Sequence, residues 1–271
     1  MTEPGSEKNT VQSLAKGFRV LQAFTAERTE MTLAETARAA AIDNATAFRF
    51  LNTLVQLGYV ERVEGTRRFR LTLKCLDLGF NAIARADLRT LARPLLRSLV
   101  GETIEAASIG VPDGADVVYV ERMQAGLARL GVDVRIGSRV PAYSTALGQA
   151  ILAFLSRETQ IRLLESRPRQ RLTAATLTDL DALLARLDQV RAQGFALSDQ
   201  ENVSGLRVLA APVLDSDGLP IAGLSVAAPA VAMPLEAFDA AARAPVMAAA
   251  RTLSRALAAG GTFAAPRANE R

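Results

Sequence analysis

Two helix-start signals, Thr32 and Asp43, divide the first part of the chain into short segments. Glu35 follows Thr32 by three residues, which predicts a capping box that satisfies free N–H groups of the first helical turn. The helix that starts there, over residues 33–40, ends at a brief turn at residues 41–42. Asp43 predicts the cap of a further helix with one apolar face, and Gly58 predicts its end because glycine adopts the left-handed conformation.

A helix precedes these two segments and a hairpin follows them. Apolar residues recur at helical spacing over residues 11–25, and residues 59–63 and 69–71 alternate as strands around a glycine-containing turn at 64–68. Helix, helix, short turn, helix and hairpin within about 60 residues is the order of a winged helix-turn-helix. The sequence predicts this domain over residues 11–71.

The outward positions of the third helix and the turn of the hairpin carry short, polar or cationic side chains. Asparagine and arginine can pair with adenine and guanine edges in the major groove, and arginines in the wing suit phosphates. We therefore predict contacts to double-stranded DNA, the alternative being a merely solvated helix face and turn. The predicted residues are Asn44, Ala45, Thr46, Arg49, Asn52, Arg67 and Arg68.

Charge and composition agree with this hypothesis and narrow the alternatives. Of a net charge of +4, residues 1–85 contribute most, with 12 Lys or Arg against 9 Asp or Glu. The chain has no histidine, which removes Ser-His and Cys-His dyads and imidazole zinc sites, so we expect no metal or cofactor. One cysteine, a polar N-terminus and no apolar run of bilayer length predict a cytoplasmic protein with no membrane partner.

The rest of the chain predicts a linker helix and a second domain. Residues 72–86 are too apolar for a flexible linker and would pack against another copy or the second domain, and Asp87 would cap a helix over 88–100. Strands are expected at 106–111, 116–122, near 130–136, and at 207–214 and 219–227, with helices at 145–155, 158–165, 178–193 and 235–257. Without repeating βαβ units, this order indicates an α+β domain over 87–258, and residues 1–10 and 259–271 are expected to be disordered tails.

Three stretches of the chain resemble the IclR family of bacterial transcription regulators. They are SLAKGFRVL at residues 13–21, ATAFRFLNTL with LGYV over 45–60, and IGSRVPAYSTALGQA at 136–150 with GLR at 205–207. The third stretch looks most like the branch that regulates catabolism of hydroxybenzoate and protocatechuate. The chain departs from the family at Asp43 and Asn44, where many members have proline and a basic residue, and at Gln149, which replaces Arg or Lys.

The resemblance implies a winged domain, a linker helix and a GAF-like domain that binds an effector, the small molecule controlling the regulator. Such proteins bind operator DNA as dimers or as tetramers of two dimers, and this branch often activates its operon, so contact with RNA polymerase is expected. We predict an aromatic acid such as hydroxybenzoate or protocatechuate as effector, with a small aliphatic acid such as glyoxylate or pyruvate as the alternative.

Candidate effector contacts come from two sources. Ser144 and Thr145 precede a helix, where hydroxyls and free N–H groups can hold a carboxylate, although simple capping would use the same residues. The resemblance assigns further positions to Ala146, Leu147, Ser198, Val208, Ser225 and Ala227. Met123 is a further candidate beside an aromatic ring, and Arg139 and Arg207 either touch the effector or pair with acids inside the fold.

Two other classes of protein are alternatives to a transcription regulator, an enzyme and a sensor that acts through another protein. Asp199 and Glu201 bring two carboxylates close together, which acid–base catalysis would use, but no metal cluster, P-loop or dinucleotide motif accompanies them. A sensor acting through another protein would not need arginines in the wing. We therefore expect no enzymatic activity.

Overall fold

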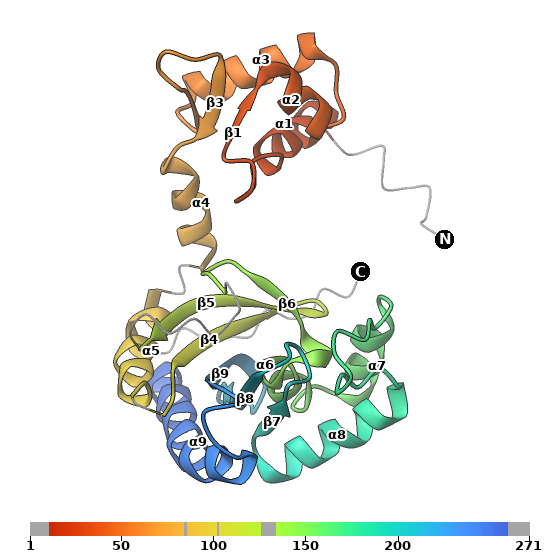
Figure 1. Cartoon of the computed structure of the whole chain (residues 1–271), viewed down its shortest axis with the longest axis vertical. Helices are drawn as coiled ribbons and strands as arrows, with labels where there is room; N and C mark the ends of the chain where they lie inside the picture. The colour runs from red at the N-terminus through yellow and green to blue at the C-terminus, as the bar shows by residue number, and fades with distance from the viewer. Residues whose placement is uncertain (1–10, 84–85, 102, 126–133, 260–271) are drawn as a thin grey trace. The chain divides into compact units, whose positions relative to one another are not determined.

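The computed structural model describes residues 11–83, 86–101, 103–125 and 134–259 (Figure 1). The chain divides into one compact unit that ends at residue 84 and another that begins at residue 85. The tails expected at 1–10 and 260–271 lie outside the described residues, whereas Ala259 is the last residue of a helix. No helix among the described residues is both long and apolar enough to cross a bilayer.

The first unit contains four helices and three short strands among its described residues. They are α1 (Gln12–Gln22), β1 (Glu30–Thr32), α2 (Leu33–Ala39), α3 (Asn44–Gln56), β2 (Val60–Arg62), β3 (Arg68–Leu71) and α4 (Lys74–Ile83). The three strands form an antiparallel sheet in the order β1-β3-β2. This is the predicted winged helix-turn-helix, followed by a helix at the expected linker position.

Local hydrogen bonds explain where the helices of this unit begin. The Thr32 hydroxyl accepts the N–H of Glu35 at 3.3 Å, and the Glu35 carboxylate accepts the N–H of Thr32 at 2.8 Å. The Asp43 carboxylate accepts the N–H of Thr46 at 2.8 Å, and Gly58 has a φ of +78° just beyond α3. Both predicted caps and the predicted stop are therefore confirmed.

The sequence missed β1, and the reason is its length. Three residues are too few for a visible period-two pattern, yet Met31 pairs with Phe69 and both side chains are buried in the unit's core with Val20 and Leu51. The first helix is also shorter than predicted, since it ends at Gln22 and not near residue 25.

The second unit is built on one six-stranded antiparallel sheet, in the order β6-β5-β4-β9-β8-β7. Its strands are β4 (Ala106–Asp113), β5 (Asp116–Gln124), β6 (Arg139–Pro141), β7 (Ala196–Asp199), β8 (Leu206–Leu214) and β9 (Pro220–Pro229). Its helices are α5 (Ala86–Leu99), the 3₁₀ turn η2 (Ala142–Ser144), α6 (Ala146–Leu152), α7 (Arg157–Glu165), α8 (Leu180–Gln193) and α9 (Leu235–Ala259). The α+β prediction is confirmed.

Helices cover both faces of this sheet. α5 and α9 lie against one face, and α6 lies against the other with α7 and α8 beyond it (Figure 1). Because both faces are covered, β9 is buried continuously from Pro220 to Ala228. Leu147 and Ile151 of α6 and Leu183 and Leu187 of α8 fill the core on the α6 side.

Several boundaries in this unit differ from the prediction. α5 starts at Ala86, so Asp87 lies in the first turn and is not its cap, and the helix continues through Pro94. Of the strand expected near 130–136, residues 126–133 lie outside the described residues, and β6 begins only at Arg139. α6 ends at Leu152 and not at 155, and the short strand β7 was not predicted.

Candidate functional sites

The helix α3 presents part of the predicted DNA-contacting set to solvent. Asn44, Ala45 and Arg49 are exposed, and the Arg49 side chain makes no ion pair with any described residue. The Thr46 hydroxyl, in contrast, donates to the Asp43 carboxylate at 2.6 Å and is engaged in capping. Phe48, which was not among the predicted contacts, is 49% exposed beside Arg49 on the same helix.

The remaining predicted residue of α3, Asn52, also has a structural contact. Its side-chain oxygen accepts a hydrogen bond from Arg62 Nη2 at 2.8 Å, which joins α3 to the first strand of the hairpin. The Arg62 guanidinium stacks over the ring of Phe69. Asn52 therefore orients the hairpin relative to α3 as well as lying on the predicted contact face.

The two arginines of the hairpin turn have different surroundings. Arg68 Nη1 donates to the backbone oxygen of Glu30 at 3.0 Å and lies 3.5 Å from Glu35 Oε2. Arg67 is exposed and contacts no acid among the described residues. The two arginines therefore differ in their structural role, because Arg68 also holds the hairpin against β1 and α2.

This difference makes a testable prediction. We expect Arg67→Ala to reduce the salt dependence of DNA binding by about one phosphate contact, a change of about 0.9 in the slope of log K against log[salt]. Arg68→Ala should lower the thermal stability of the winged domain more than it changes that slope. Fluorescence anisotropy on labelled promoter DNA across a salt series measures the first effect. Equal slopes for Arg67→Ala and the wild type would exclude Arg67 from the phosphate contacts.

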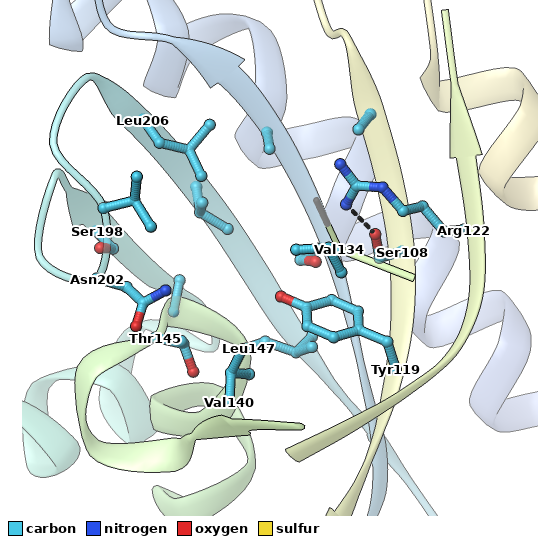
Figure 2. Close-up of a pocket in the computed structure, with 16 residues that line it drawn as sticks. Ser108, Tyr119, Arg122, Val134, Val140, Thr145, Leu147, Ser198, Asn202 and Leu206 are labelled. Atoms are coloured by element: carbon cyan, nitrogen blue, oxygen red, sulfur yellow. Dashed lines mark hydrogen bonds between the residues drawn. The ribbon is translucent and has the colours of Figure 1, made fainter. Parts of the chain in front are cut away.

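A cavity of about 40 Å³ lies in the second unit, between the sheet and α6 (Figure 2). Seven of the eight predicted effector positions line it: Thr145, Ala146, Leu147, Ser198, Val208, Ser225 and Ala227. The exception is Ser144, which is buried and whose hydroxyl donates to the side-chain oxygen of Asn202 at 3.1 Å. Ser144 therefore does not line the cavity itself but holds Asn202, which does.

At the start of α6, the Thr145 hydroxyl is engaged in helix capping. The Thr145 hydroxyl accepts the N–H of Gly148 at 3.1 Å and donates to the backbone oxygen of Pro141 at 3.2 Å. The helix has only seven residues, so its dipole is small. Simple capping, the alternative interpretation, describes Thr145 as the structure shows it.

Sequence reasoning missed the most polar part of the cavity wall. Ser108, Tyr119, Arg122 and Asn202 all line it, and Arg122 Nη1 donates to Ser108 Oγ at 3.1 Å (Figure 2). Met123, which was predicted to face an aromatic ring, does not line the cavity.

A β-bulge explains why Arg122 was missed and why Met123 was wrongly assigned to the cavity. Glu121 pairs with Ile109 and Tyr119 pairs with Gly110, so Val120 is an extra residue without a partner. Regular alternation from Tyr119 would direct residues 121 and 123 toward the cavity. The bulge reverses the alternation and places Arg122 on the cavity side with Tyr119.

The ionisable groups around the cavity have distinct roles. Burial lowers the pKa of the Arg122 guanidinium, which nevertheless stays protonated at neutral pH, and burial raises the pKa of the Tyr119 phenol.

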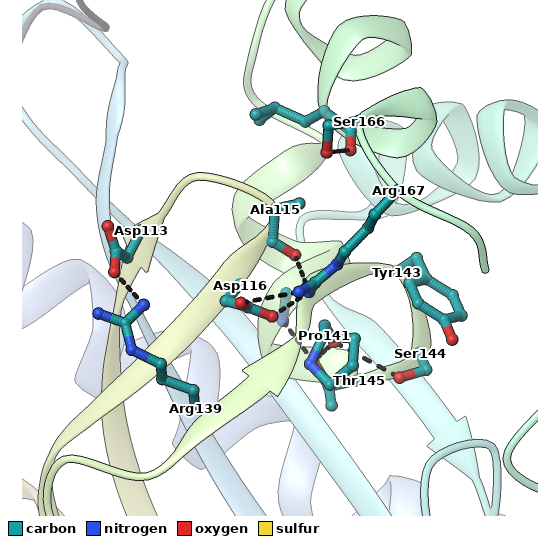
Figure 3. A network of polar contacts seen from close by, with 12 residues as sticks. Asp113, Ala115, Asp116, Arg139, Pro141, Tyr143, Ser144, Thr145, Ser166 and Arg167 are labelled. Atoms are coloured by element: carbon teal, nitrogen blue, oxygen red, sulfur yellow. Dashed lines mark hydrogen bonds and ion pairs between the residues drawn. The ribbon is translucent and has the colours of Figure 1, made fainter. Parts of the chain in front are cut away.

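The two arginines that were candidate effector contacts form ion pairs. Arg139 pairs with Asp113 (Figure 3), and Arg207 Nε donates to Asp199 at 2.8 Å. Neither of these two arginines lines the cavity, so both follow the alternative in which they pair with acids inside the fold.

The two acids considered for catalysis are engaged in structural contacts. Glu201 is buried and accepts hydrogen bonds from Gln149 Nε2 and from Arg186 Nη1, each at 2.9 Å. Asp199 is held by Arg207. Glu201 therefore fixes the loop that carries Asn202 into the cavity. Arg186 supplies the positive charge beside Glu201, since position 149 has glutamine where many family members have arginine or lysine.

Comparisons with known proteins agree with this architecture. The model of the IclR helix-turn-helix domain matches residues 13–64, and that of the bacterial transcriptional regulator IclR C-terminal domain matches residues 80–255. A winged DNA-binding domain followed by this α+β domain defines a DNA-binding transcription regulator. The chain belongs to the IclR family, which is a family of transcriptional regulators and not of enzymes.

The proteins that this chain resembles include several different transcription regulators. The transcriptional regulator KdgR of Escherichia coli is 37% identical over 82% of this chain and 84% of its own. The p-hydroxybenzoate hydroxylase transcriptional activator of Acinetobacter baylyi is 35% identical over 79% and 80%. An IclR homolog from Microbacterium hydrocarbonoxydans, solved with 4-hydroxybenzoate, is 26% identical over 90% and 99%, with a TM-score of 0.79. The hydroxybenzoate and protocatechuate branch is thus one of several that the chain resembles.

Proposed function

We propose that a small organic acid binds the cavity of the second unit and changes the affinity of the winged domain for operator DNA. The observation that carries this proposal is the convergence of seven predicted positions on one cavity, whose wall combines apolar side chains with polar groups. The two sites would be linked by a coupling free energy, so that effector and DNA each alter the affinity of the other. We place this activity in the cytoplasm.

An aromatic acid such as hydroxybenzoate or protocatechuate is the first candidate effector. Leu147, Val208 and Tyr119 supply apolar and aromatic wall for a ring. The 4-hydroxybenzoate complex of the Microbacterium homolog supports the same choice. A small aliphatic acid such as pyruvate or glyoxylate is the second candidate, because about 40 Å³ holds roughly three water molecules. A ring would require side-chain rotations, which are common on binding.

We propose that the DNA contacts come from α3 in the major groove and from the hairpin beside the phosphates. On α3 they are Asn44, Ala45, Thr46, Arg49 and Asn52. Exposed apolar side chains in α1 and α4 and on the residue just before each of these helices favour self-association into dimers or tetramers. They are Val11, Leu14, Phe18, Leu73 and Leu76. If the regulator activates its operon, the DNA-bound form contacts RNA polymerase.

The DNA-binding part is tested by substitution on α3. We expect Arg49→Ala to weaken binding to the protein's own promoter fragment by about 1–3 kcal/mol, the cost of one lost bidentate base contact. Gln56→Ala, at the exposed end of the same helix, is the matched control and should bind as the wild type does. A mobility-shift titration measures both. Unchanged retardation of the fragment by Arg49→Ala combined with Asn52→Ala would contradict the assignment.

The effector part is tested on the wild-type chain. Isothermal titration calorimetry against 4-hydroxybenzoate, protocatechuate, pyruvate and glyoxylate should find at least one ligand, and the same ligand should shift the mobility-shift midpoint. Ser225→Ala should weaken that binding. A panel in which no acid binds would show that the proposed effector class is wrong.

A further inference from the structure

Among the described residues, the cavity wall has one charged side chain, and no described carboxylate pairs with it. Of the described residues that line the cavity, only Arg122 is charged at neutral pH. Its guanidinium donates to the neutral hydroxyl of Ser108 and pairs with no carboxylate in the described part of the chain. A half-buried cation without a partner is unfavourable, and an anion in the cavity would relieve that cost.

The bulge at Val120 decides the sign of this charge. With regular pairing, Glu121 would face the cavity after Tyr119, and the wall would be negative. In the structure Glu121 lies on the other side of β5, where it accepts hydrogen bonds from Arg89 and Arg93 of α5. The strand therefore separates Glu121, which two arginines neutralise, from Arg122, which no carboxylate of the described residues neutralises. Bulges commonly redirect a side chain in this way beside a binding site.

The opposite side of the cavity is polar but uncharged. Ser198 on β7, Asn202 in the loop after it and Thr145 before α6 face Arg122 across the cavity (Figure 2). Leu147 and Val208 add apolar side chains to the lining. β5 and β7 are separated in the sheet by three strands, β4, β9 and β8. The cavity thus has a cationic side and a neutral hydrogen-bonding side.

We propose that Arg122 binds the acidic group of the effector, while Ser198 and Asn202 form hydrogen bonds with a hydroxyl or keto group at its other end. This inference rests on the proposed function and adds to it the orientation of the ligand and the residue that selects for negative charge. Ser108 positions the guanidinium. The ligand class is a small monoanionic hydroxy or keto acid, and neutral analogues of the same shape bind weakly.

The test compares an acid with its neutral amide. Wild-type protein should bind 4-hydroxybenzoate more tightly than 4-hydroxybenzamide by roughly 10- to 150-fold, since one charge-assisted hydrogen-bonded contact is worth that ratio. Arg122→Gln should lose this preference and bind the two equally, and Arg122→Lys should keep part of it. Arg139→Gln removes an arginine outside the cavity and should leave the preference intact. Pyruvate and pyruvamide are measured in parallel.

The outcomes separate this inference from the proposed function. If folded Arg122→Gln binds the acid as tightly as the wild type does, Arg122 is not the anchor, although the effector class stands. If Arg122→Gln fails to fold, the wild-type ratio decides, because equal affinity for acid and amide also overturns the assignment. If the wild type binds none of the acids, both the proposed function and this inference are wrong.

Discussion

Replacing Arg89 and Arg93 together by methionine is expected to destabilise the second unit by about 3–5 kcal/mol. Their Nε atoms lie 3.2 and 3.0 Å from Oε2 of Glu121, whose side chain is only 3% exposed. Without them, a carboxylate stays buried between β5 and α5 with no cation to offset its desolvation. Urea unfolding followed by far-ultraviolet circular dichroism measures the loss.

A third substitution provides the control for this prediction. Adding Glu121→Gln removes the buried charge and should recover most of the lost stability, although two ion pairs remain absent. If the triple variant is as unstable as the double variant, the loss of stability comes from the missing side-chain packing of the arginines and not from the buried, unpaired carboxylate of Glu121.

Gly148→Ala is expected to have the second large effect, a destabilisation of about 1–3 kcal/mol from overpacking. A Cβ atom at this position would lie 2.2 Å from both Cα and the carbonyl oxygen of Ala142. The contact is with backbone, so no side-chain rotation can relieve it, and η2 and α6 would have to move apart. Because Leu147 lines the cavity, weaker effector binding should accompany the loss of stability.

Gly101→Ala is the matched control for this substitution. A Cβ atom there would meet nothing within 4 Å, so the urea midpoint should remain near that of the wild type. A Gly148→Ala variant that unfolds at the wild-type midpoint would show that α6 tolerates a wider separation from η2 than the structure indicates.

Features fixed by neighbouring residues were predictable from the sequence. The caps at Thr32 and Asp43 depend on side chains that reach only three residues along the chain, and both appear as expected. Gly58 was predictable for the same reason, since its left-handed conformation is a local property. The strand β1 was not, because it is defined by pairing with β3, about forty residues further along the sequence.

The cavity shows the same division between local and distant information. Six of its lining residues were anticipated by the family resemblance and Thr145 by its place before a helix, but Arg122 was not, since its direction depends on the bulge at Val120. Nothing in the run from Asp116 to Arg122 marks an extra residue. Similarly, Arg68 looked equivalent to Arg67 until β1, which was not predicted, placed the backbone oxygen of Glu30 beside it.

The two-sided use of β5 has a consequence for engineering biosensors from this scaffold. Arg122 and Glu121 are adjacent in sequence, yet one lines the cavity beside α6 and the other anchors α5. Cavity-facing positions such as Ser108, Arg122 and Ser225 can therefore be randomised to accept new ligands while the ion pairs behind the sheet are kept. Libraries restricted to those positions should contain a larger folded fraction than libraries that also vary their immediate neighbours.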